Sequence, residues 1–229
     1  GVRVVPGGSS IRDGCYLGNQ QFCKLITLNS GTIPVTSTTQ IPPNAVGLTI
    51  KTASLNIATQ STSGLDLAMN YQRPLGNGTI TFSLLGNYLL SAYDSGLAAS
   101  GATKLVGSLD YTISYPRWSG FLSVQYSGEA FSLFVQERLT SKGTRNASFV
   151  EGVNISDNSV PMVAYTDITA TYKFSALGAE DEIFFSISNL FNKAPPATAT
   201  STSHSLTPTN YSLYDVIGRR FSLGVRFKL

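Results

Sequence analysis

Charged side chains and long apolar runs are both scarce in this chain of 229 residues. Only 13% of the residues are charged and 42% are hydrophobic, and Ser, Thr, Asn and Gly fill the difference. A typical soluble domain carries roughly twice that charged fraction, whereas a disordered chain would be less hydrophobic. No stretch approaches the run of about 20 apolar residues that a membrane helix requires. If the chain meets a membrane, we expect it to do so with β-strands.

The sequence also lacks the residue combinations that catalysis, metal binding and nucleic-acid binding need. The net charge of +3 is small and the basic residues are scattered, which disfavours nucleic acid as a partner. The single histidine, His204, has no evident nucleophile or base nearby in sequence, and a zinc site would need more ligands. Asp181 and Glu182 are adjacent, so strand geometry would point their side chains apart. We therefore predict no enzymatic activity, no cofactor and no metal.

The two cysteines, Cys15 and Cys23, lie close together among Gly, Asn, Gln and Ser. This loop-like stretch favours a local disulfide, and hence an oxidising compartment such as the periplasm or the cell surface. The alternative is a pair of free thiols. An exposed polar setting disfavours that alternative, because free cysteine is usually buried.

The last nine residues alternate strictly between apolar and polar positions. Phe221, Leu223, Val225, Phe227 and Leu229 are apolar, and the intervening side chains are polar, charged or absent. Side chains of a strand point alternately to the two faces of a sheet, so this pattern predicts a strand with one apolar and one polar face.

The same alternation recurs along the chain and predicts seven strands with unequal connections. The strands are expected near residues 65–72, 80–90, 121–127, 131–135, 168–174, 183–191 and 221–229. The connections alternate between short turns, such as 74–78, and long segments, of which 93–117 contains a further alternating piece at 105–113. Residues 1–60 are the least clear part, with short strands expected only at 24–28 and 33–38.

This pattern favours a membrane barrel over a soluble β-sandwich. Outer-membrane barrels combine short periplasmic turns with long external loops, and their strands need about ten residues to cross the bilayer. Aromatic residues near the strand ends would form an interfacial girdle: Tyr71, Tyr88, Trp118, Tyr126 and Tyr172. Core packing of the same aromatics in a soluble domain is the competing interpretation.

Several segments, in this order, resemble the closing part of TonB-dependent outer-membrane receptors. They are Cys15–Cys23, Gly64-Leu-Asp-Leu67, Tyr115-Pro-Arg-Trp118, Thr166-Asp-Ile-Thr-Ala-Thr-Tyr172, Ile187-Ser-Asn-Leu-Phe-Asn192 and Tyr214-Asp-Val-Ile-Gly-Arg-Arg-Phe221. One departure is the terminal Leu229, where the family usually ends in an aromatic residue.

The resemblance implies an all-β, antiparallel transmembrane barrel of about 22 strands with a plugged lumen. This chain would supply about seven to nine of those strands. Residues 1–229 would then be the C-terminal portion of the barrel, with strands over 61–229 and an irregular segment over 1–60. The chain opens without Met or a signal-like segment, and we expect a fragment or a processed product. The plug domain and the segment that engages the coupling protein would lie upstream.

The implied function is active transport across a bacterial outer membrane. The receptor would capture a scarce ligand, such as a ferric siderophore, a cobalamin or a glycan, and would be energised through TonB, with outer-membrane lipid around it. Ligand contacts are expected in the connections 93–117, 143–162 and 192–212, and at Trp118, Arg138 and Asn192. Two alternatives stay open: a free-standing small barrel, porin-like or enzymatic, and a surface β-sandwich that binds sugars or adheres to cells.

Overall fold

The computed structural model describes residues 2–4, 8–28, 48–52, 55–58, 60–94, 103–110, 114–176, 179–198 and 208–227. The chain divides into two units, each described by itself below. Unit 1 comprises residues 1–62 and 92–104, and unit 2 comprises residues 63–91 and 105–229. The expected strand at 33–38, the histidine His204 and the last two residues lie outside the described residues.

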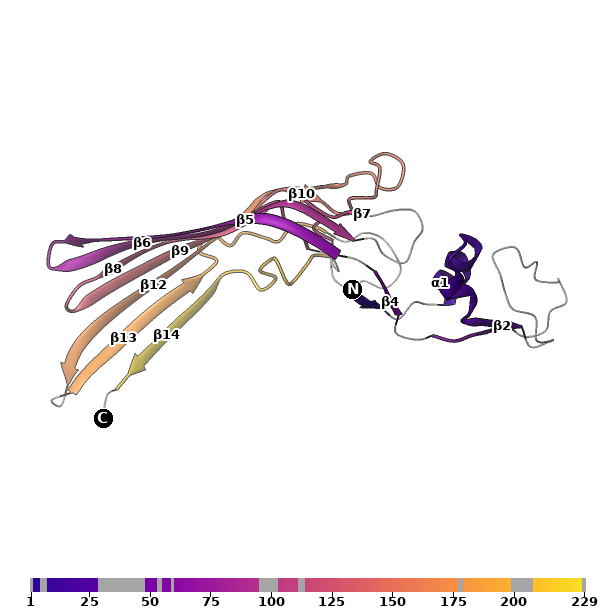
Figure 1. The fold of residues 1–229 in the computed structure, drawn as a ribbon. Helices are drawn as coiled ribbons and strands as arrows, with labels where there is room; N and C mark the ends of the chain where they lie inside the picture. Colours follow the sequence, from indigo (N-terminus) through magenta and orange to yellow (C-terminus); the bar gives the residue numbers. More distant parts are fainter. Residues whose placement is uncertain are drawn as a thin grey trace. The chain divides into compact units, whose positions relative to one another are not determined.

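Unit 2 is built on one antiparallel sheet, which we call the main sheet (Figure 1). Its seven long strands are β5 (Gln60–Leu75), β6 (Gly78–Asp94), β8 (Trp118–Ser127), β9 (Phe131–Thr140), β12 (Val163–Ala176), β13 (Ala179–Ser188) and β14 (Arg220–Arg226). The first three residues of β5 and the last three of β6 belong to unit 1. They lie in the order β14-β13-β12-β9-β8-β6-β5, so each pairs with its neighbours along the chain. All seven strands expected from the alternation are present.

The connections between these strands alternate in length as the sequence predicts. Residues 76–77, 128–130 and 177–178 separate three pairs of strands, whereas 95–117, 141–162 and 189–219 are the long connections. Gly76 has a φ of +59°, the conformation that a two-residue hairpin turn asks of glycine at its first central position. The long segments contain the short strands β7 (Thr103–Lys104), β10 (Gly143–Thr144) and β11 (Ser159–Val160). Of the alternating piece at 105–113, residues 105–110 are described, and Leu109 forms an isolated antiparallel bridge with Ser114.

The register of the main sheet separates its two faces. One row of direct cross-strand partners is apolar through six strands: Phe82, Val124, Val135, Ile168, Ile187 and Phe221. Tyr71 of β5 extends this row, since its ring centroid lies 6.4 Å from that of Phe82. The next row, on the other face, is mostly polar: Thr81, Gln125, Phe134, Thr169, Ser186 and Ser222. We call these the apolar face and the polar face.

The structure confirms the all-β, antiparallel class in part. Its described residues form antiparallel sheets with two short helices, and the main sheet ends at β14 on one side and β5 on the other. These residues therefore form an open sheet and no closed barrel. None of the helices in the described part of the chain is long and apolar enough to cross a membrane.

Unit 1 contains two short helices that the sequence did not predict, α1 (Gly8–Tyr16) and α2 (Gln20–Cys23). Asn19 caps α2, with its side-chain oxygen accepting a hydrogen bond from the Gln21 N–H at 3.0 Å. Small strands accompany the helices: β1 (Val2–Val4) pairs with β4 (Leu55–Ala58), and β2 (Ile26–Leu28) pairs with β3 (Leu48–Ile50). Of the strand expected at 24–28, residues 26–28 are confirmed.

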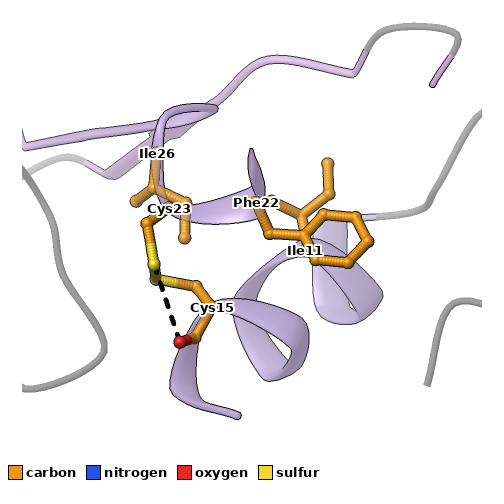
Figure 2. Packing of buried hydrophobic residues seen from close by; sticks show 5 residues of the cluster. All are labelled: Ile11, Cys15, Phe22, Cys23 and Ile26. Atoms are coloured by element: carbon orange, nitrogen blue, oxygen red, sulfur yellow. Dashed lines mark hydrogen bonds between the residues drawn. A yellow bond between two sulfur atoms is a disulfide. The ribbon is translucent and has the colours of Figure 1, made fainter. Parts of the chain in front are cut away.

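The predicted disulfide between Cys15 and Cys23 is confirmed, but its setting is not the exposed loop that we expected (Figure 2). The two cysteines are 3% and 1% exposed and belong to a buried cluster with Ile11, Phe22 and Ile26. The bridge joins the end of α1 to α2. Ile11 and Cys15 are four residues apart and therefore share one face of α1, which explains why the cysteine is buried beside Ile11.

Candidate functional site

The polar face ends, on the side of the long connections, in a cluster around Arg138. In β9, Arg138 is the direct partner of Phe121 on one side and of Tyr165 on the other. Its guanidinium carbon lies 5.3 Å from the centre of the Tyr165 ring, and its Nε lies 3.7 Å from a carboxylate oxygen of Asp167. The other Asp167 oxygen accepts a hydrogen bond from the Asn189 N–H at 2.8 Å. The arginine is thus held between an aromatic ring and a carboxylate.

A buried apolar cluster brings all three long connections to this end of the sheet. Leu109, Val160 and Tyr214 come one from each connection, and they pack with Val163 and Tyr165 of β12. Val163 and Tyr165 alternate with the apolar-face residues of β12 and therefore belong to the polar face. The connections consequently pack against the polar side of the main sheet, and we call this assembly the loop cluster.

Hydrogen bonds between distant residues tie the loop cluster together. The Asn210 side-chain amide donates to the carbonyl oxygen of Asp110 at 2.6 Å and also to the Ser114 hydroxyl. Main-chain bonds of 2.8 Å link Thr144 to Gly107 and Leu109 to Thr144. The described parts of the three connections in which we expected ligand contacts are therefore tied to one another.

Asp215 organises the last connection where it returns to the main sheet. Its carboxylate accepts hydrogen bonds from the Ile217 N–H at 3.0 Å, the Gly218 N–H at 3.3 Å and the Arg220 guanidinium at 2.9 Å. Burial by itself raises the pKa of this carboxyl, but the two main-chain donors and Arg220 outweigh it and the pKa lies below its ordinary value. The carboxylate therefore stays charged at neutral pH. Burial also raises the pKa of the neighbouring Tyr214 phenol to about 12.

The structure does not bring together the three residues expected to contact ligand. Trp118 begins β8 opposite Tyr88 and shares the apolar face with Leu122. Arg138 lies on the polar face in the cluster described above. Asn192 lies in the last connection with a φ of +51°, and its side-chain oxygen accepts a hydrogen bond from the Arg219 N–H at 3.0 Å. Ligand contact by these three residues stays a prediction.

Sequence reasoning missed Tyr165, Asn210, Tyr214 and Asp215, which hold the loop cluster. Tyr165 is an aromatic residue at a position of its strand where the alternation places polar side chains, and this exception could have indicated a contact on the polar face. Asn210, Tyr214 and Asp215 act through partners far away in the sequence or through turn geometry, which alternation does not report. Within the described residues, no group of three or more His, Cys, Asp or Glu side chains could hold a metal ion.

Comparison with protein families, curated proteins and solved structures finds no match for this chain.

Proposed function

We propose that this chain is the C-terminal part of the barrel of an outer-membrane receptor that takes up a scarce ligand with energy supplied through TonB. The observation that carries the proposal is the exposure of the apolar face. Each of the seven long strands of the main sheet presents at least one large apolar side chain there that is exposed. Among them, Leu65 is 64% exposed, Phe185 is 42% exposed and Leu223 is 70% exposed.

An apolar surface of this extent requires a covering. Proteins rarely leave contiguous apolar patches larger than a few hundred Å² in water. Lipid is the occupant that suits a twisted antiparallel sheet with one apolar face, one polar face, short turns at one end and long connections at the other. The polar row through Thr81, Thr169 and Ser222 suits the wall of a water-filled or plugged lumen.

In this proposal the loop cluster lies on the external side and the polar face lines the lumen. The external connections capture the ligand, a ferric siderophore, a cobalamin or a glycan. Energy from the inner-membrane proton gradient, passed on by TonB, then opens the path through the lumen. A free-standing small barrel would use the same two faces and differs in having about eight strands in all.

The β-sandwich alternative is less well supported. A sandwich buries the apolar face of one sheet against a second sheet about 10 Å away. The apolar face of the main sheet instead carries exposed side chains such as Tyr71 at 55% and Leu67 at 58%, measured on the described residues.

Two substitutions on adjacent residues of β13 test the proposal. Phe185 belongs to the apolar face and Ser186 to the polar face. An arginine in the lipid-facing position near the bilayer centre costs about 2–4 kcal/mol, whereas a position in the lumen tolerates it. In the full-length protein, Phe185→Arg should reduce outer-membrane assembly, measured as heat-modifiable folded protein in the membrane fraction, and Ser186→Arg should assemble normally. Equal assembly of both variants, or recovery of the native protein in the soluble fraction, contradicts the proposal.

A further inference from the structure

Two exposed apolar side chains interrupt the polar face of the main sheet, and they are direct partners. Leu85 of β6 and Phe121 of β8 pair across the two strands, with exposures of 56% and 43%. Among the described strand residues within 63–91 and 105–229, they are the large apolar side chains on the polar face that are exposed; Tyr93, near the end of β6, is a further one at 40%. Phe184 is also on the polar face, but its ring packs against Gly224 of the next strand. A Cβ added to Gly224 would lie 2.4 Å from this ring.

The same two residues line a shallow hollow in the polar face. Its other lining side chains on this face include Asn70 of β5, Ser83 of β6, Ser123 of β8 and Gln136 of β9. None of the residues that line the hollow is charged. An apolar floor with a few hydroxyl and amide groups around it is the usual make-up of a small-molecule site, in which the polar groups fix the orientation.

The charged side chains beside the hollow on the polar face already have partners: the Asp66 carboxylate accepts a hydrogen bond from the Asn87 amide at 2.7 Å. Arg138 is the strand partner of Phe121, but its guanidinium faces Tyr165 and Asp167. An anionic ligand in the hollow would therefore compete with a carboxylate for this arginine and would find no other cation among the lining residues. The hollow favours an uncharged ligand.

We propose that this hollow binds one ring of a neutral saccharide. The C–H groups of a sugar ring pack on the face of an aromatic side chain, whose π electrons make that face partly negative. Sugar hydroxyls both donate and accept hydrogen bonds, and Ser123, Gln136 and Asn70 offer both functions. This inference rests on the proposed function in one respect, because it takes the polar face to be the wall along which the transported ligand passes.

The test uses neighbouring residues with equal exposure on opposite faces. Phe121 and Leu122 are both 43% exposed, and only Phe121 belongs to the polar face. The full-length protein, purified in detergent, is titrated calorimetrically with neutral hexasaccharides of glucose, mannose, galactose, xylose and N-acetylglucosamine. An oligogalacturonate and a ferric trihydroxamate are titrated beside them.

At least one neutral oligosaccharide should bind, and Phe121→Ala should weaken that binding by about tenfold or more. The control variant Leu122→Ala should bind the sugar with unchanged affinity. Phe121→Trp keeps an aromatic surface and should retain binding, so it provides the test if Phe121→Ala fails to fold. Binding of only the anionic sugar or the ferric chelate, binding unaffected by Phe121→Ala, or no binding of any neutral sugar overturns the inference. Assembly of the same variants in the outer membrane is scored separately. If the native protein assembles normally in the outer membrane but binds no neutral sugar, the saccharide inference is wrong and the proposed transport function stands. If the protein is soluble and binds a neutral sugar, the proposed transport function is wrong and the saccharide inference stands.

Discussion

The side-chain amide of Asn210 donates a hydrogen bond of 2.6 Å to the main-chain carbonyl of Asp110, 100 residues earlier in the chain. The same amide contacts the hydroxyl of Ser114, and the Asn210 residue is 1% exposed. This bond joins the first long connection of the main sheet to the last. It makes the loop cluster a single unit rather than three independent loops.

Removal of this amide should loosen the loop cluster. Asn210→Ala leaves the half-buried carbonyl of Asp110 without this donor, a cost of about 1 kcal/mol or more. We expect faster hydrogen exchange at residues 105–110 and 208–215 and earlier proteolytic cleavage there. Asn154→Ala serves as the control, because the Asn154 side chain makes an exposed bond to Val150, four residues away. Equal exchange in the two variants contradicts the role given to Asn210.

The last connection should loosen in acid. The pKa of Asp215 lies below its ordinary value of 3.8 in the folded state, so its contribution to stability is fully present above that value. As the pH falls through the lowered pKa, the carboxylate takes up a proton and the bonds from Ile217, Gly218 and Arg220 weaken. Protection from hydrogen exchange at residues 215–220, measured against the intrinsic rate at each pH, should therefore fall at acid pH in the native protein. In Asp215→Asn this protection should be lower at neutral pH already and should change less with pH.

The disulfide should stabilise unit 1. Cys15 and Cys23 close a loop with a sequence separation of 8, for which the chain-entropy account gives about 2–3 kcal/mol. The double variant Cys15→Ser, Cys23→Ser should expose the cluster of Ile11, Phe22 and Ile26, seen as faster exchange at residues 11–26. Exchange in the strands of the main sheet should stay unchanged. Loss of protection in β8 and β9 would show that the bridge also supports unit 2.

Two glycines that are direct partners in the main sheet should respond differently to alanine. A Cβ at Gly120 would lie 2.9 Å from the main-chain oxygen of Leu85, whereas a Cβ at Gly86 would lie 4.0 Å from its nearest neighbour, the oxygen of Ser119. Gly120→Ala should therefore destabilise the sheet by about 1–3 kcal/mol through overpacking, and Gly86→Ala should have little effect. Denaturant unfolding of both variants under the same detergent conditions measures the difference. A larger loss for Gly86→Ala would be contrary to this geometry.

The sequence predicts the main sheet well because strand alternation is a local property. Phe221, Leu223 and Val225 mark one face of β14 within a few residues, and the same holds for the other six strands. The helix α1 could not be predicted in this way. It contains two glycines and two serines, which are poor helix formers, and its cysteine bridge and its contact with Phe22 form only in the folded unit.

The candidate site was less predictable for a related reason. The expectation that the long connections lie at one end followed from their lengths, but their mutual packing depends on pairs such as Leu109 with Tyr214. No local pattern encodes contacts between residues about a hundred positions apart. The hollow beside Phe121 left a fainter signal, since Leu85 and Phe121 occupy positions where the alternation calls for polar side chains.

The most direct test of the account is the environment of two adjacent residues in β14. Leu223 belongs to the apolar face and is 70% exposed, whereas Ser222 belongs to the polar face. In the full-length protein assembled in lipid vesicles, each is replaced singly by cysteine and labelled with an environment-sensitive fluorophore. The label at position 223 should be quenched by spin-labelled lipid and protected from aqueous iodide, and the label at position 222 should show the opposite. Equal quenching of both labels by iodide, with no quenching by lipid at position 223, would contradict the proposal that the apolar face contacts the membrane.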